Sequence, residues 1–186
     1  RPGVRADGGP AADSSAAGLL NVTAPNHSPG PVDVVVTTPS GSATKVNGFT
    51  YLPVVTIAAT DSSAAESPLN TGQFTLTRTG ATTSALTVTV TIGGAAPTAT
   101  NGTDYTSIST SQTIAAGQAS KVITVTPIND TVVESVENVT LTVASGAGYA
   151  VGSPSSATVT ISSEDVGTMV SIAATDATAA ESPLNT

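Results

Sequence analysis

The sequence predicts an all-β protein made of antiparallel β-sandwiches that follow one another in tandem. Apolar and polar residues alternate with the two-residue period of a strand in several short runs, and turns rich in Gly, Pro and Asn separate these runs. No window of useful length has a helical period. A long internal repeat indicates that the same β unit begins a second time.

The repeat relates a segment in the first half of the chain to one near the end of the second half. Residues 55–71 recur as residues 170–186, 115 residues later, with 14 of the 17 positions identical. The three differences exchange one small residue for another. A period of this length is too long for a solenoid repeat and fits a whole β domain. We therefore expect domains at residues 1–52 and 53–167, and the first strand of a further repeat at residues 168–186.

The first unit, residues 1–52, differs from the repeat. Its opening 17 residues are rich in Gly, Ala and Pro and have no clear period. An apolar segment follows at residues 19–24, and Pro53 marks the boundary to the next unit. Strands are expected at residues 32–37 and 49–51, with turns at Pro29-Gly30 and Ser40-Gly41.

The second unit contains the clearest strands. Thr fills most of the alternate positions, and its β-branched side chain suits the outer face of a pleated sheet. Glycine-containing turns, such as Gly93-Gly94, Asn101-Gly102 and Gly117, separate the strands. The residues predicted to face the core are Phe74, Leu76, Leu86, Val88, Val90, Ile92, Ile123, Val125, Val139, Leu141, Val143, Val159 and Ile161. The aromatic residues, Phe49, Tyr51, Phe74, Tyr105 and Tyr149, are expected to pack in the core or at corners.

Composition excludes several classes of function. The chain has 186 residues, 13 acidic against 5 basic side chains, and a formal net charge of -8, which argues against a nucleic-acid partner. It has no cysteine, so disulfides, thiolate nucleophiles and Cys-ligated metals are absent. His27 is the one histidine, which excludes multi-histidine metal sites. The longest aliphatic run is Val34 to Val36, so we expect no membrane-spanning helix.

Residues 53–166 combine several specific motifs: an acidic residue after the first strand, the sequences FTLTRTG and GTDY, the acidic turn INDTVVE, and an acidic pair at the end. With these motifs the segment resembles a Calx-beta domain over its whole length. The resemblance implies a seven-stranded sandwich that binds calcium at one end. Residues from 168 onward look like the start of a second such domain. The matching residues are Glu66, 74–80, 102–105, 128–134 with Glu137, 157–161 and Glu164-Asp165.

Residues 18–52 look like the later half of an IPT/TIG domain, which has an immunoglobulin-like fold. The matching segments are 23–30, 32–36, 39–41 and 48–51. The resemblances together imply tandem immunoglobulin-like β-sandwiches, with a partial IPT/TIG-like domain at residues 1–52.

Acidic residues in turns and at strand ends are the candidate metal ligands. Calcium takes six to eight oxygen ligands at roughly 2.3–2.6 Å, mostly carboxylates and carbonyls. One end of a sandwich can gather such residues, although turn acids are also common without a metal. Relative to the family, Asn129, Ser135-Val136 and Glu164 depart from the usual acidic pattern, which predicts a site of lower charge with fewer ions. The candidate ligands are Glu66, Asp104, Asp130, Glu134, Glu137, Glu164 and Asp165.

Catalytic groups are not expected. His27 with Asp33 and a nearby serine could be imagined as a catalytic triad, but a turn histidine is the favoured interpretation. Glu134 and Glu137 are three residues apart and do not face each other across a sugar cleft. We therefore predict that the protein is not an enzyme.

The sequence favours an extracellular or cell-surface structural protein, such as a stalk, an adhesin or a filament subunit, stiffened by calcium. Its partners would be neighbouring repeats, identical subunits, or a cell-surface or carbohydrate target. A more specific hypothesis is assembly by strand exchange, in which the last strand completes the open sheet of a neighbouring copy. Residues 169–174 that pair within their own chain, or that pair with nothing, would contradict this hypothesis. Two alternatives are an accessory binding module of a secreted enzyme and a calcium-responsive regulatory module.

Overall fold

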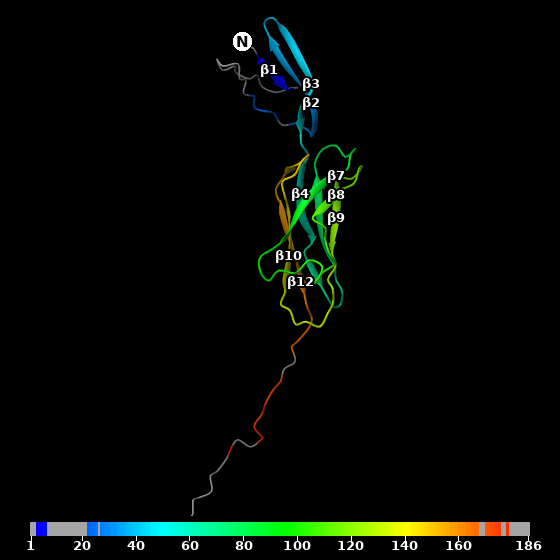
Figure 1. The fold of residues 1–186 in the computed structure, drawn as a ribbon, viewed down its shortest axis with the longest axis vertical. Coiled ribbons are helices and arrows are strands. Elements are labelled where there is room, and N and C mark those ends of the chain that lie inside the picture. The colour runs from blue at the N-terminus through cyan, green and yellow to red at the C-terminus, as the bar shows by residue number, and fades with distance from the viewer. Residues whose placement is uncertain (1–2, 7–21, 26, 168–169, 176–177, 179–186) are drawn as a thin grey trace, which may run out of the picture.

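The computed structural model describes residues 3–6, 22–25, 27–167, 170–175 and 178. It contains two β units, a small sheet and a larger sandwich, that meet near residues 52–53 (Figure 1). In the part of the chain that it describes, no helix is long and apolar enough to cross a bilayer.

The first unit is one antiparallel sheet in the order β1-β2-β3, formed by β1 (Gly3–Ala6), β2 (Gly30–Thr38) and β3 (Gly41–Tyr51). Both predicted strands lie within β2 and β3. The turn between them is formed by Pro39 and Ser40, and Gly41, which was expected in the turn, begins β3. In the described residues of this unit there is no second sheet, so the IPT/TIG-like sandwich stays a prediction. Phe49 is 44% exposed and so lies outside a core; it packs edge-on against Tyr51, with ring centroids 4.9 Å apart.

The second unit is the predicted sandwich. One sheet has the order β5-β12-β10-β7-β8 and the other β11-β4-β6-β9. The strands are β4 (Val54–Asp61), β5 (Ser63–Ala65), β6 (Gly72–Arg78), β7 (Leu86–Gly93), β8 (Ser111–Ile114), β9 (Ser120–Val125), β10 (Glu137–Val143), β11 (Ala150–Val151) and β12 (Ser156–Ser162).

Two features of the sandwich differ from the expected seven antiparallel strands. The first strand leaves one sheet after Asp61 and joins the other at Ser63, so it counts as β4 and β5. Each half of this divided strand then pairs with a strand that runs in the same direction, so the pairs β11–β4 and β12–β5 are parallel. The remaining ladders of the sandwich are antiparallel, as predicted.

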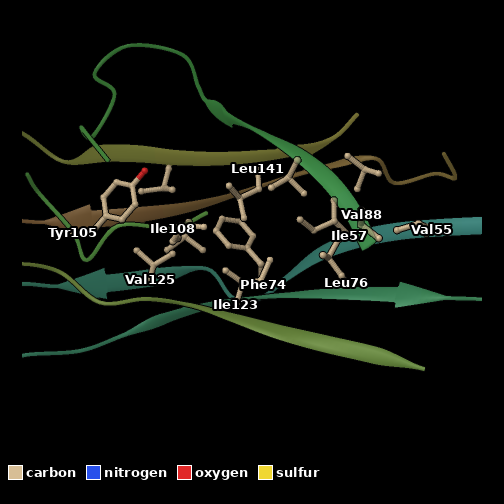
Figure 2. Close-up of a cluster of buried hydrophobic side chains, with 14 of the residues drawn as sticks. Val55, Ile57, Phe74, Leu76, Val88, Tyr105, Ile108, Ile123, Val125 and Leu141 are labelled. Atoms are coloured by element: carbon tan, nitrogen blue, oxygen red, sulfur yellow. The ribbon is translucent and has the colours of Figure 1, made fainter. Parts of the chain in front are cut away.

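The core lies between the two sheets and follows the predicted alternation (Figure 2). Phe74, Leu76, Val88 and Leu141 are each 0% exposed, while the threonines between them lie on the outer faces. Each such large apolar side chain contributes roughly 1.5–3 kcal/mol when fully buried. Tyr149 closes one corner: its hydroxyl donates to the carbonyl of Ala144 at 2.7 Å and accepts from the amide of Thr89 at 3.1 Å.

Arg78 organises the end of the sandwich that faces the first unit. It is 5% exposed, and its guanidinium donates to the carbonyl oxygens of Gln118 at 3.0 Å, Ser84 at 2.8 Å, Thr82 at 3.1 Å and Ala115 at 3.4 Å. These bonds hold together the loops after β6 and before β9. We call this end the Arg78 pole.

The first unit contacts the Arg78 pole. A groove of about 380 Å³ lies between them, lined by Tyr51, Leu52 and Pro53 on one side and by residues 81 and 83–86 on the other. Gly80 has a φ of +81°, and a Cβ on it would lie 2.5 Å from the Cβ of Pro29. The two units therefore touch directly.

Residues 170–175 form no strand, and Val170 and Ile172 are 90% and 98% exposed. Residues 170–174 have no ladder partner, while Met169 lies outside the described residues. The unpaired residues 170–174 therefore count against assembly by strand exchange.

Candidate metal centre

The candidate ligands gather at the end of the sandwich opposite the Arg78 pole, where β12 ends and the chain leaves the domain (Figure 1). Glu66 follows β5, and Asp165 follows β12. Asp130 and Glu134 lie in the loop between β9 and β10, and Glu137 begins β10. Asp104 lies between β7 and β8. Strand ends from both sheets therefore contribute to one acidic end.

Six of the seven predicted ligands form two clusters. The Glu66 cluster consists of Glu66, Asp130 and Asp165, and the Glu134 cluster consists of Asp104, Glu134 and Glu137. Within each cluster, one carboxylate oxygen from every residue lies within 4.8 Å of the others. The motifs of the sequence did not indicate this division into two groups.

Glu164 is the predicted ligand that neither cluster contains. Its side chain is exposed, whereas the side chain of its neighbour Asp165 is partly buried. Successive side chains of an extended segment point to opposite sides, so only one of the two can face the clusters. Glu164 still contributes a negative charge close to Glu66.

Local turns orient the two aspartates. Gly102, with a φ of +86°, allows the tight turn in which the amide of Asp104 donates to the carbonyl of Thr100 at 3.1 Å. One carboxylate oxygen of Asp104 accepts the amide of Thr100. One oxygen of Asp130 accepts the amide of Val132 at 2.6 Å. Each aspartate thus uses one carboxylate oxygen to shape its own loop.

Glu66 is the most buried acidic side chain of the site. Its amide donates to the carbonyl of Ser162 at 3.1 Å, which fixes it beside the end of β12. The residue is 3% exposed, and its Oε2 atom has no hydrogen-bond partner. Oδ2 of Asp165 is also buried without a partner. Leaving a buried charged oxygen unpaired is costly, so a cation or a proton is strongly favoured at these atoms.

The electrostatics of the site favour a bound positive charge. Burial raises the pKa of Glu66, and the charges of Glu134, Glu164, Asp130 and Asp165 raise it further. Burial also raises the pKa of Glu134, with added contributions from Asp104, Asp130 and Asp165. The pKa of Glu137 is raised by burial first and then by the charges of Asp104 and Glu134. These carboxylates therefore hold protons more tightly than free ones, and a divalent cation can replace the proton.

The donors also fit a particular class of cation. All the clustered side-chain donors are carboxylate oxygens, which suit hard cations such as calcium, whereas structural zinc sites are usually built from Cys and His. The clusters come from several loops, which is compatible with the flexible, oxygen-rich coordination of calcium. The residues present therefore fit calcium.

Comparison with known proteins identifies the family. Residues 50–165 match the Calx-beta domain. None of the curated proteins matches the chain. Among solved structures, the apo-form CBD1 domain of Calx is 19% identical, with a TM-score of 0.48 over 62% of this chain and 100% of that one. The calcium binding domain CBD12 of CALX1.1 is 20% identical, with a TM-score of 0.47 over 59% of this chain and 44% of that one. Because the matched region, residues 50–165, is more than half of the chain, this protein belongs to the Calx-beta family.

Proposed function

We propose that residues 53–167 form a calcium-binding module with two cation positions, one at the Glu66 cluster and one at the Glu134 cluster. The observation that carries this proposal is the Oε2 atom of Glu66, which is buried among like charges without a partner. One of the solved structures similar to this chain is named a calcium binding domain, which also supports it.

The grouping of the carboxylates into two clusters supports two ions. Two divalent cations would neutralise four of the six clustered carboxylate charges. Asn129 and Glu164, which depart from the family's acidic pattern, are both exposed, and neither belongs to a cluster. The ligand set is therefore concentrated on the six clustered residues.

We further propose that the module serves a non-enzymatic structural protein of the cell surface or extracellular space, such as a stalk, an adhesin or a filament subunit. Calcium would stiffen the end of the module from which the chain continues. The triad considered for catalysis is not assembled: His27 stacks on Tyr51, with ring centroids 4.9 Å apart, and Asp33 accepts the amide of Asn47 at 2.8 Å. Neighbouring repeats, identical subunits, and a cell-surface or carbohydrate target remain the proposed partners.

A calcium-responsive regulatory module is the second candidate function. The observation that favours it is the gathering of six carboxylates without a basic residue among them, because repulsion would change the loops when the cation leaves. A large change in molecular shape on adding calcium, measured by small-angle X-ray scattering, would support regulation over a purely structural role.

Thermal unfolding with calcium and with a chelator tests the calcium proposal. At a calcium concentration of 100 times the dissociation constant, the bound state gains about 2.7 kcal/mol per site. Magnesium at the same concentration serves as the control, since it prefers a rigid octahedral site and keeps several waters. No shift of the unfolding temperature at millimolar calcium would reject the proposal.

A further inference from the structure

We propose that Asn47 is a site of spontaneous deamidation in the folded protein, and that the fold protects the other Asn-Gly pair, Asn101-Gly102, from the same reaction. The modification converts the side-chain amide of Asn47 to a carboxylate and needs only water. It concerns the first unit and is independent of calcium binding, because Asn47 lies on β3 and belongs to neither cluster.

The chain contains two Asn-Gly pairs, Asn47-Gly48 and Asn101-Gly102. A glycine after asparagine favours deamidation, because the attacking backbone amide then has no side chain beside it to hinder its approach. Both asparagines are exposed, so access to water does not distinguish them. The difference lies in whether the two reacting groups are free to meet.

Hydrogen bonds hold both reacting groups of the pair Asn101-Gly102. Nδ2 of Asn101 donates to the carbonyl of Ile108 at 3.0 Å, and Oδ1 accepts the amide of Ile108 at 2.8 Å. The amide of Gly102, which would be the nucleophile, donates to the carbonyl of Tyr105 at 3.0 Å. The side-chain carbon of Asn101 therefore reaches the nitrogen of Gly102 only after all of these hydrogen bonds break.

The side chain of Asn47 has no such restraint. The pairing of β2 with β3 shifts between Val32 and Val34, and residues 46–48 form a bulge without partners in this ladder. Asn47 has a φ of +53°, outside the strand region. In the part of the chain that the structure describes, its side-chain amide makes no hydrogen bond. Its amide carbon is therefore free to rotate toward the nitrogen of Gly48.

Packing requires glycine at position 48. A Cβ there would lie 2.9 Å from Cγ2 of Val34 and 3.0 Å from the carbonyl oxygen of Lys45. A larger residue would force β2 and β3 apart at the bulge. The fold thus selects the residue that makes Asn47 reactive.

The reaction balances without an oxidant or a reductant. The backbone nitrogen of Gly48 attacks Cγ of Asn47, and the bond between Cγ and Nδ2 breaks. Nδ2 leaves as ammonia and takes the proton of the Gly48 amide, which leaves a cyclic succinimide. Water then opens the ring. Breaking the bond from nitrogen to Cγ gives aspartate, and breaking the bond from nitrogen to the backbone carbonyl carbon gives isoaspartate, in which the chain continues through Cβ and Cγ.

Both products disturb the bulge. Oδ1 of Asp33 accepts the backbone amide of Asn47 at 2.8 Å, so the new carboxylate forms close to an existing one, and the like charges repel. Isoaspartate also lengthens the backbone of β3, which shifts its register against β2. Leu52 and Pro53, which line the groove at the Arg78 pole, follow directly after β3. The modification therefore weakens the first unit and its contact with the sandwich.

The test follows both asparagines in the full chain, incubated in mildly alkaline buffer well below its unfolding temperature. Aliquots are digested by an acid protease, because low pH limits further deamidation, and the peptides are analysed by liquid chromatography and mass spectrometry. Deamidation raises the mass of a peptide by about 1 Da, and the isoaspartate form elutes apart from the aspartate form. A parallel sample in guanidinium chloride gives the rates for the unfolded chain. N47Q identifies the signal of Asn47.

In the folded protein we expect Asn47 to deamidate at least about tenfold faster than Asn101, because Asn101-Gly102 must first break its hydrogen bonds. In guanidinium chloride the two rates should be similar, and folded N47Q should lack the fast reaction. A rate at Asn101 equal to or above that of Asn47 in the folded protein would overturn the inference. An equally large difference in guanidinium chloride would also overturn it, since the local sequence and not the fold would then cause the selectivity.

Hydrogen exchange tests the consequence for the first unit. The deamidated protein is separated from the parent by ion exchange, and both are compared strand by strand. We expect faster exchange in β2 and β3 of the deamidated protein and unchanged exchange in the strands of the sandwich, such as β6 and β10. Equal exchange in β2 and β3 would contradict the argument that the modification weakens the bulge. This comparison needs no variant, so it holds even if N47Q does not fold.

Discussion

Replacing Glu66 by Gln should change the stability of the metal-free and the calcium-bound protein in opposite directions. In the metal-free protein, Glu66 is a buried carboxylate with an unpaired Oε2 atom beside two other carboxylates. Glutamine has nearly the same shape without the charge, so it removes the repulsion and part of the desolvation cost. In the calcium-bound protein, the same change removes a charged ligand.

The magnitude follows from the distances. Carboxylate oxygens of Asp130 and Asp165 lie within 4.8 Å of one of Glu66. At that separation, two unit charges repel by about 0.9 kcal/mol at the dielectric constant of water and by about 3.5 kcal/mol at an effective value near 20. Asp130 is exposed, so the lower part of this range applies to that pair. We expect E66Q to stabilise the metal-free protein by about 1–3 kcal/mol, or roughly 3–10 °C in unfolding temperature.

The assay is thermal unfolding of the parent and E66Q, each in chelator and across a calcium titration. E66Q should unfold at a higher temperature in chelator and should show a smaller calcium-induced shift. E164Q is the matched control, because Glu164 is exposed and outside both clusters, and it should change both quantities much less. A lower unfolding temperature of E66Q in chelator would contradict the argument that this carboxylate is unfavourable without a cation.

Two further predictions concern pH and the opposite pole. The pKa values of Glu66, Glu134 and Glu137 are raised in the folded state above an ordinary value of 4.5, so the folded state binds more protons than the unfolded state above that pH. The stability of the metal-free protein in urea should therefore fall as the pH rises from about 4.5 toward neutrality; stability that rises through this window would refute the assignment. R78K should lower the free energy of unfolding by about 2–4 kcal/mol, because lysine cannot reproduce the set of bonds to four carbonyls. The change is measured as a lower urea midpoint at an unchanged m-value. K121R is the control, and equal midpoints for parent and R78K would count against this role of Arg78.

The sandwich was predictable because apolar and polar residues alternate along each strand in step with buried and exposed side chains. The alternation through Val88 and Val90, and again through Val139 and Leu141, indicates which face of each strand packs against the other sheet. β8 was not predicted, since it has four residues and its inward positions include Gln112, which is polar. The crossing of the first strand between sheets at Asp61 was also missed, because it changes the partner of the strand and not its period.

The candidate site was predictable as a set of residues but not as an arrangement. The sequence and its resemblance to the family pointed to seven candidate acidic residues, and the structure groups six of them in two clusters. Their division depends on the path of the loop between β9 and β10, which has no periodicity to constrain it. The choice between Glu164 and Asp165 depends on which side of the extended segment faces the clusters. Val132, Val133 and Val136 lie in the same loop, and only the fold shows that their side chains are exposed.

The contrast between the two ends of the module is the strongest argument that the acidic end is functional. At the Arg78 pole, a buried charge is fully engaged: the guanidinium has four carbonyl partners within the chain. At the other end, buried oxygens of Glu66 and Asp165 have none, although the loops there are as long and as rich in hydroxyl side chains. A sequence that satisfies a buried charge at one end has the means to do so at the other. Folding alone gives no reason to gather six carboxylates there, since serine or threonine would end the same strands without repulsion. The unpaired oxygens are therefore best explained by a ligand that the chain does not itself supply.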